Sequence, residues 1–241
     1  MKRIVMALGI STCIALPPAP ASATPPPPPD MPSPARCPAT PPVDEGLNER
    51  KGPLVMPPRY AALIRSNRTN LAVWTMANAN FCYSIANISE ARNFTMSADF
   101  RFIGFDWYGY EEGGHIVIDR TGRGQAVDTG AKPVFSASGR QMAAIEWSES
   151  GFGSLNGFAI WRVNPVGLTR TVMIEQVPPL ADWRVDSWGG EACVNLSGIP
   201  NSRIRDGSAD LRKLPRDRYV ARPAGPNWRI TRATGRGCPA R

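Results

Sequence analysis

The sequence predicts an all-β domain of two to four small, blade-like antiparallel sheets, with a β-sandwich as the alternative. Short runs rich in β-branched and aromatic residues recur throughout residues 59–241, which is typical of strands. Turn-forming pairs such as Gly113-Gly114 and Asn156-Gly157 separate these runs. A helical pattern is confined to one short stretch after the prolines, so helices contribute little to the predicted fold.

The predicted elements follow in chain order. Residues 59–64, directly after the prolines, are predicted as a short helix. Eleven later runs are predicted as strands, because each lies between turn formers and is apolar or alternating. They are residues 81–85, 100–108, 115–119, 133–136, 141–147, 158–163, 169–176, 183–187, 192–196, 218–221 and 228–231.

Residues 132–163 carry a more specific pattern. The string KPVFSASGRQMAAI at 132–145, followed by FAIWRV at 158–163, resembles one blade of TolB-like β-propellers. In that family an aromatic-Ser-Pro-Asp-Gly turn joins the first two strands, and Ala137 and Ser138 replace the usual Pro and Asp here. The resemblance implies an incomplete or small β-propeller, because blades of about 40 to 45 residues allow four at most. It implies no particular chemistry.

The strand runs group into about three blade-like sheets. An incomplete propeller would leave unpaired sheet edges, so the β-sandwich stays open as the alternative.

The first 23 residues have the pattern of a signal peptide. Lys2 and Arg3 precede a short apolar run, and Ala21-Ser22-Ala23 matches the small-residue cleavage pattern. The mature chain is therefore expected to begin at Thr24, in the periplasm or outside the cell. Prolines from Pro17 onward end the apolar run before the roughly 20 residues that a transmembrane span needs.

Lipidation at Cys13 is the minor alternative for this segment. It is disfavoured because Thr12 stands where a lipoprotein signal usually has a smaller residue.

Residues 24–58 are rich in proline and poor in apolar side chains, which predicts an extended, disordered tether. The folded domain is then expected to span residues 59–241, which is long enough for one substantial core.

Four cysteines follow the signal peptide, namely Cys37, Cys82, Cys193 and Cys238. In an exported chain this even number predicts two disulfides. The 45-residue spacing of both the first and the last pair favours local pairing over a Cys37–Cys238 and Cys82–Cys193 arrangement. No metal site is predicted, because the chain has one histidine and no C-x-x-C pair.

The net charge of +8 belongs to the C-terminal end, where residues 203–241 hold ten Arg and one Lys against three Asp. Such segments bind nucleic acid, anionic lipid or acidic polymers. Apolar residues such as Val220 and Ile230 interleave with these arginines, as on the solvated face of strands. An exported protein seldom meets nucleic acid, so none is expected as a partner.

The densest group of functional residue types lies in and after the run at 105–114. It comprises Asp106, Trp107, Tyr108, Tyr110, Glu111, Glu112 and His115. Aromatic faces beside carboxylates are what glycan recognition requires. The same pattern also fits an ordinary strand without a binding role. In that interpretation Phe105 and Trp107 point into the core, and Glu111 and Glu112 belong to a solvated turn. Glycoside hydrolysis would need two carboxyls roughly 5 to 9 Å apart, which predicts a further acid such as Asp186 or Glu191 in the same cleft.

Catalytic residues are not predicted. His115 is the only histidine, and residues 151–157 miss the spacing of a nucleophile elbow. Dinucleotide, phosphate-loop and calcium-loop motifs are absent from the sequence, so no cofactor is expected. The interpretation favoured by the sequence is a non-enzymatic binding module for a protein or glycan partner. A hydrolase acting on cell-envelope polysaccharide is the alternative, and the sequence does not indicate an oligomeric state.

Overall fold

The computed structural model describes residues 31–40, 50–147, 153–204, 210–235 and 237–239. They belong to one compact unit. The predicted signal peptide, Cys13 and residues 24–30 and 41–49 of the predicted tether lie outside the described residues.

The described residues form four antiparallel sheets, in each of which strands that follow one another along the chain are paired. The first sheet contains β1 (Ile64–Ser66), β2 (Asn70–Trp74) and β3 (Asn80–Ser84). The second contains β4 (Glu90–Met96), β5 (Phe102–Tyr108), β6 (Gly113–Asp119) and β7 (Gln125–Asp128). The third contains β8 (Val134–Phe135), β9 (Gln141–Glu146), β10 (Gly157–Asn164) and β11 (Gly167–Ile174). The fourth contains β12 (Leu180–Trp188), β13 (Val194–Pro200), β14 (Asp217–Ala224) and β15 (Asn227–Arg232).

Short 3-10 helices are the other regular elements. They are η1 (Pro34–Arg36), η2 (Pro58–Tyr60), η3 (Asn201–Arg203) and η4 (Leu211–Lys213). The predicted all-β class is therefore confirmed, because the described residues form four small sheets, none of them closed into a barrel. The strand runs were grouped into about three sheets, one fewer than the described residues contain, because only one of the three strands of the first sheet was predicted.

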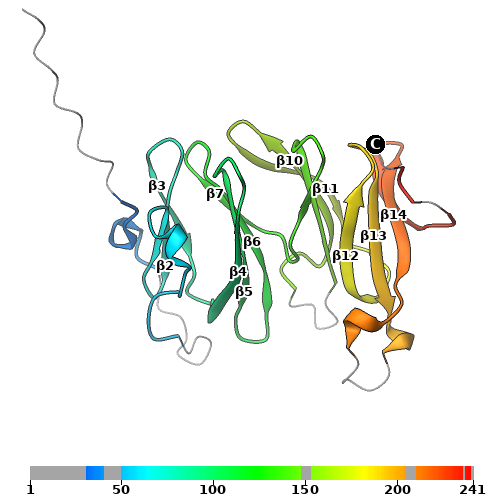
Figure 1. The fold of residues 1–241 in the computed structure, drawn as a ribbon, viewed down its shortest axis with the longest axis horizontal. Helices are drawn as coiled ribbons and strands as arrows, with labels where there is room; N and C mark the ends of the chain where they lie inside the picture. Colours follow the sequence, from blue (N-terminus) through cyan, green and yellow to red (C-terminus); the bar gives the residue numbers. More distant parts are fainter. Residues whose placement is uncertain (1–30, 41–49, 148–152, 205–209, 236, 240–241) are drawn as a thin grey trace, which may run out of the picture. The chain divides into compact units, whose positions relative to one another are not determined.

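The sheets pack face to face in chain order, with one hydrophobic cluster between each neighbouring pair (Figure 1). Successive side chains on a central strand point to opposite faces of its sheet, so one strand contributes to two clusters. On β6, Ile116 and Ile118 face the first sheet, whereas Val117 faces the third. On β9, Ala144 contributes to the cluster with the second sheet and Ile145 to the cluster with the fourth. Strands that are buried on both faces lack polar alternation for this reason.

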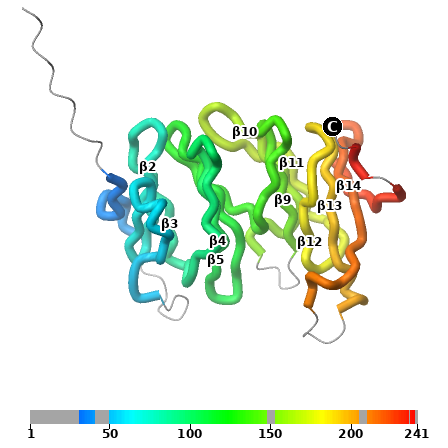
Figure 2. Tube along the Cα trace, in the orientation of Figure 1, coloured from blue at the N-terminus to red at the C-terminus, as the bar shows by residue number. Residues whose placement is uncertain are grey.

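The first sheet is reinforced by residues that the sequence assigned to the tether. Leu54 is buried within the first hydrophobic cluster. Arg50 donates hydrogen bonds to the carbonyl oxygens of Ile85 and Ile88. Figure 2 shows the segment around η1 beside β2 and β3. The folded part of the chain therefore extends on the N-terminal side of Arg59, the predicted boundary.

The predicted helix at residues 59–64 is wrong. Only a single 3-10 turn forms at Pro58–Tyr60, and Ile64 already belongs to β1. The Tyr60 side chain is buried in the core, and the Trp74 N–H donates to the Leu63 carbonyl oxygen at 2.8 Å. Pairing with β2 thus outweighs the local helical tendency of this apolar stretch.

Both disulfides follow the predicted local pairing, Cys37 with Cys82 and Cys193 with Cys238. Two such bonds indicate folding in an oxidising, exported environment. Among the described residues, no helix is both long enough and apolar enough to cross a membrane. The same residues contain no cluster of three or more His, Cys, Asp or Glu arranged to hold a metal ion.

Candidate functional site

The residues predicted as a binding site lie at the end of β5, in the β5–β6 turn and at the start of β6. The turn is closed by a hydrogen bond from the Gly109 N–H to the Glu112 carbonyl oxygen at 2.8 Å. Glu111 adopts a positive φ of 57°, a conformation that the tight turn imposes on it. The hairpin register places Asp106 opposite His115 and Tyr108 opposite Gly113.

Asp106 and His115 form an inward-facing pair below the turn. The His115 Nδ1 lies 2.5 Å from Asp106 Oδ1, and Asn93 Nδ2 donates to the other carboxylate oxygen at 2.6 Å. Burial lowers the pKa of His115, while the Asp106 carboxylate acts in the opposite direction. Among the described residues, no serine hydroxyl or cysteine thiol is hydrogen-bonded to the His115 ring. The pair therefore orients a buried imidazole and satisfies its Nδ1.

Trp107 is also structural. Its ring is buried, and its Nε1–H donates to Asp128 Oδ2 at 2.8 Å. Burial raises the pKa of Asp128 although Gly130, Trp107 and Ser154 supply hydrogen bonds to its carboxylate. Trp107 therefore anchors the end of β5 from below and leaves its neighbour Tyr108 on the solvent side.

The two tyrosines are exposed. Tyr108 is 44% and Tyr110 58% exposed, which places both among the large hydrophobic side chains on the surface. The Arg92 guanidinium lies 5.3 Å from the Tyr108 ring centroid and is paired with Glu90. One face of the Tyr108 ring is thus covered by a side chain of the neighbouring strand β4, which holds the ring in place and leaves its other face for a ligand.

A shallow hollow of about 490 Å³ lies over the turn and extends to the end of β9. Its lining residues are Tyr108, Gly109, Glu111, Glu112, Gly113, Glu146, Trp147 and Gly153. Glu112 is positioned by Asn87, whose Nδ2 donates to its Oε1 at 3.0 Å. Burial raises the pKa of Glu146, which accepts the Leu155 N–H at 2.8 Å. The hollow combines two aromatic side chains with three carboxyl groups.

The structure brings only part of the predicted site together. Tyr108, Glu111 and Glu112 line the hollow, whereas Tyr110 is exposed beside it. Asp106, Trp107 and His115 lie beneath as hydrogen-bonded support.

Glu146 and Trp147 were not predicted as members of the site. They complete the predicted strand 141–147, and an acid next to an aromatic at a strand end was the signal available. The additional acids suggested for a hydrolase are elsewhere. Glu191 accepts hydrogen bonds from Ser138 and Gln141, and Asp186 lies on the fourth sheet.

Comparison with known proteins gives no family for this chain. No protein-family model matches it, and no curated protein matches it. The resemblance of residues 132–163 to a TolB-like blade therefore stays a prediction, although the turn at 136–139 does join β8 to β9.

Proposed function

We propose that this protein is an exported, non-enzymatic binding module that recognises a glycan at the hollow over the β5–β6 turn. The observation that carries the proposal is the placement of Tyr108 and Trp147 in one hollow with the carboxyl groups of Glu111 and Glu112. The two disulfides support export to the periplasm or the medium, with membrane anchoring through Cys13 as the lesser alternative.

The chemistry of the hollow suits a sugar. Aromatic faces pack against the C–H faces of sugar rings, and carboxylates accept hydrogen bonds from sugar hydroxyls. The hollow is wide and shallow, so it fits one face of an oligosaccharide better than an enclosed small molecule. A protein partner is the alternative occupant, because exposed tyrosines also serve as anchors in protein interfaces.

The test replaces both exposed tyrosines, Tyr108→Ala and Tyr110→Ala, and measures binding to an array of cell-envelope oligosaccharides. Binding should be lost while the melting temperature barely changes, because exposed side chains contribute little to stability. Phe100→Ala is the matched control, since Phe100 is 53% exposed in a different turn. Retained glycan binding by the double variant would contradict the proposal, as would a loss of several kcal/mol in stability, the usual cost of truncating buried aromatics.

One observation favours polysaccharide hydrolysis as a second function. The half-buried Glu146, with its raised pKa, lines the same hollow as Glu111 and Glu112. A carboxyl whose pKa is raised, close to other carboxyl groups, is the arrangement of a general acid and its partner. The backbone bonds to Glu146 oppose this role, because they hold its carboxyl toward Leu155 and Asn156. Release of reducing ends from a bound glycan, abolished by Glu146→Gln, would establish hydrolysis in place of binding alone.

A further inference from the structure

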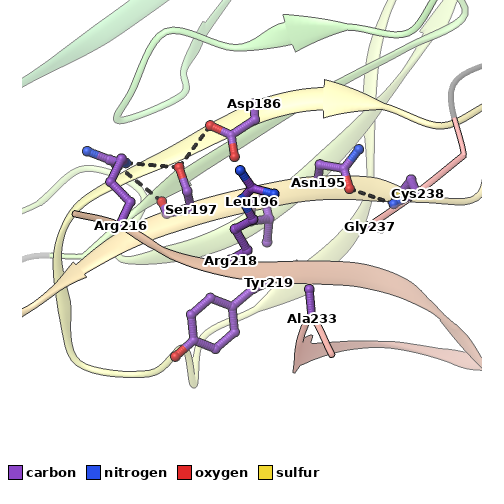
Figure 3. A pocket seen from close by; sticks show the side chains of 10 residues that line it. All are labelled: Asp186, Asn195, Leu196, Ser197, Arg216, Arg218, Tyr219, Ala233, Gly237 and Cys238. Atoms are coloured by element: carbon purple, nitrogen blue, oxygen red, sulfur yellow. Dashed lines mark hydrogen bonds between the residues drawn. The ribbon is translucent and has the colours of Figure 1, made fainter. Parts of the chain in front are cut away.

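A second pocket, of about 590 Å³, lies on the fourth sheet. Its polar lining comes from β12, β13, β14 and Arg216, which directly precedes β14, and the C-terminal segment at Gly237 and Cys238 borders it (Figure 3). Along β13, Val194 and Leu196 belong to the cluster shared with the third sheet. Strand alternation therefore turns Asn195 and Ser197 to the opposite, outer face, where the pocket opens.

The polar side chains of this pocket are held in place. Ser197 Oγ donates to Asp186 Oδ1 at 2.8 Å and accepts from Arg216 Nε at 2.9 Å. Arg216 Nη1 also pairs with Asp182 Oδ2 at 2.6 Å, an oxygen that it shares with Arg184, so the Arg216 side chain is held in place within the protein. Asp186 keeps its second carboxylate oxygen without a hydrogen-bond donor among the described residues. This carboxylate oxygen of Asp186 can therefore accept a hydrogen bond from a ligand.

Arg218 contributes the opposite charge. It is exposed, and within the described part of the chain no hydrogen bond or ion pair holds its guanidinium. Figure 3 shows its side chain turned toward Asp186. The unpaired guanidinium of Arg218 and the fixed carboxylate of Asp186 therefore offer a ligand one donor and one acceptor side by side.

The rim is fixed by the C-terminal disulfide. Cys238 is bonded to Cys193, and its N–H donates to Asn195 Oδ1 at 2.6 Å. Asn195 Nδ2 in turn donates to Ser187 Oγ at 3.0 Å. Because these bonds join groups of the protein alone, they hold the rim in a fixed geometry, which lowers the entropic cost of recognition.

We propose that this pocket binds a small hydroxylated anion of the acidic-sugar class. The guanidinium fork of Arg218 matches a carboxylate or phosphate, and the free oxygen of Asp186 accepts a hydrogen bond from a neighbouring hydroxyl. The Asp186 charge disfavours bare anions, so the hydroxyl is part of the recognition. An apolar anchor is not offered by Tyr219, because its ring packs against Trp183 on the inner face of the sheet.

The surroundings favour such ligands. Arg222 on β14 and Arg229 on β15 lie opposite each other in the register and are both exposed. Their positive potential concentrates anions near the pocket. The pocket and the hollow over the β5–β6 turn are on different sheets, so the two proposals are independent and are tested separately.

The test titrates the full mature chain with glucuronate, glucose 6-phosphate and glucose at constant ionic strength, with calorimetry as the readout. Glucuronate and glucose differ only at the carboxylate, so binding of the acid and not of glucose is expected. Comparison of glucuronate with glucose 6-phosphate identifies which anionic group the pocket takes. Arg218→Gln should weaken binding about tenfold or more, because it removes a charge-assisted hydrogen-bonded pair.

Single-residue variants distinguish binding in the pocket from non-specific attraction of the ligand to the positively charged surface. Arg229→Gln makes the same charge change outside the lining residues and should leave affinity within about twofold, since that contact is long-range and screened. Asp186→Asn should weaken glucuronate binding, because the amide replaces an acceptor that is charged. The proposal is overturned if neither acid binds, if glucose binds equally well, or if Arg229→Gln weakens binding as much as Arg218→Gln. Thermal unfolding of each variant confirms that the fold is intact.

Discussion

His115 provides a direct residue-scale test, because it is the only histidine in the chain. Its ring is buried and hydrogen-bonded to Asp106, and burial lowers its pKa from the ordinary 6.5. In an NMR titration the single set of imidazole signals should therefore shift with a midpoint below 6.5. A midpoint at or above that value would mean that the Asp106 carboxylate outweighs desolvation.

The same pKa shift predicts how stability depends on pH. A histidine with a lowered pKa in the folded state binds protons more readily when unfolded, so its contribution to stability is complete above pH 6.5 and decreases as the pH falls. Asp128 and Glu146 have raised pKa values and act with the opposite sign, gaining stability as they become protonated. Urea unfolding between pH 7 and 5 of wild type and His115→Gln should show a weaker acid dependence in the variant.

Gly104 allows His115 to fit. A Cβ at position 104 would lie 2.8 Å from His115 Nε2 and 2.9 Å from Thr95 Oγ1. Gly104→Ala should therefore destabilise the protein by about 1–3 kcal/mol, the usual cost of overpacking a core. Gly52→Ala is the control, because no atom lies within 4 Å of its added Cβ, and it should be near neutral. Equal unfolding free energies for the two variants would contradict the tight contact.

At the scale of elements, all eleven predicted strands overlap strands of the structure, and four strands within the described part of the chain were missed. Two of these, β4 and β7, are the edges of the second sheet, where only one neighbour pairs and polar residues are tolerated. β1 is a three-residue edge strand in a stretch with helical character. β2 lies at the centre of its sheet and is buried almost throughout, so the alternation that identifies strands is absent.

The binding hollow was only partly predictable for a related reason. Tyr108, Glu111 and Glu112 are close in sequence, so a local pattern identified them. Glu146 and Trp147 reach the same hollow only because the second and third sheets pack together. The acid beside an aromatic at the end of β9 is visible in the sequence, but a single sequence does not show that these two residues share a hollow with the β5–β6 turn.

The N-terminal segment supplies an element-scale prediction. A chain that begins at Met31 should keep the melting temperature of the full chain, because it retains η1, the Cys37–Cys82 bond and Leu54. A chain that begins at Arg59 loses that disulfide, buried Leu54 and the hydrogen bonds of Arg50. It should be destabilised by several kcal/mol, as expected on loss of a disulfide and a core leucine. Equal melting temperatures would show that these contacts contribute nothing.

At the scale of the whole compact unit, neighbouring sheets share a hydrophobic cluster, and the described residues show no such cluster between the fourth sheet and the first. Each sheet is therefore stabilised mainly by its neighbours in the chain, as in repeat proteins. The first and last sheets have one such neighbour each. A disulfide is attached to each of them, Cys37–Cys82 at one and Cys193–Cys238 at the other.

This arrangement predicts that the two disulfides act locally. Replacing Cys37 and Cys82 by Ser should increase hydrogen exchange in β1 to β3, and replacing Cys193 and Cys238 should increase it in β13 to β15. Each bond joins residues 45 positions apart, so either loss should cost about 4 kcal/mol by the chain-entropy relation. Uniform loss of protection throughout all four sheets in either variant would show a single cooperative unit instead.

The order of the disulfides also has a consequence for how the chain matures. Each bond links cysteines that are consecutive in the sequence beyond the predicted signal peptide, so the two covalent loops are neither nested nor interlaced. When an exported chain emerges from the membrane with its N-terminus first, Cys37 and Cys82 are both exposed to oxidation before Cys193 has emerged. A thiol oxidase that joins cysteines in the order of emergence therefore produces the native pairs directly, and no disulfide isomerase is required.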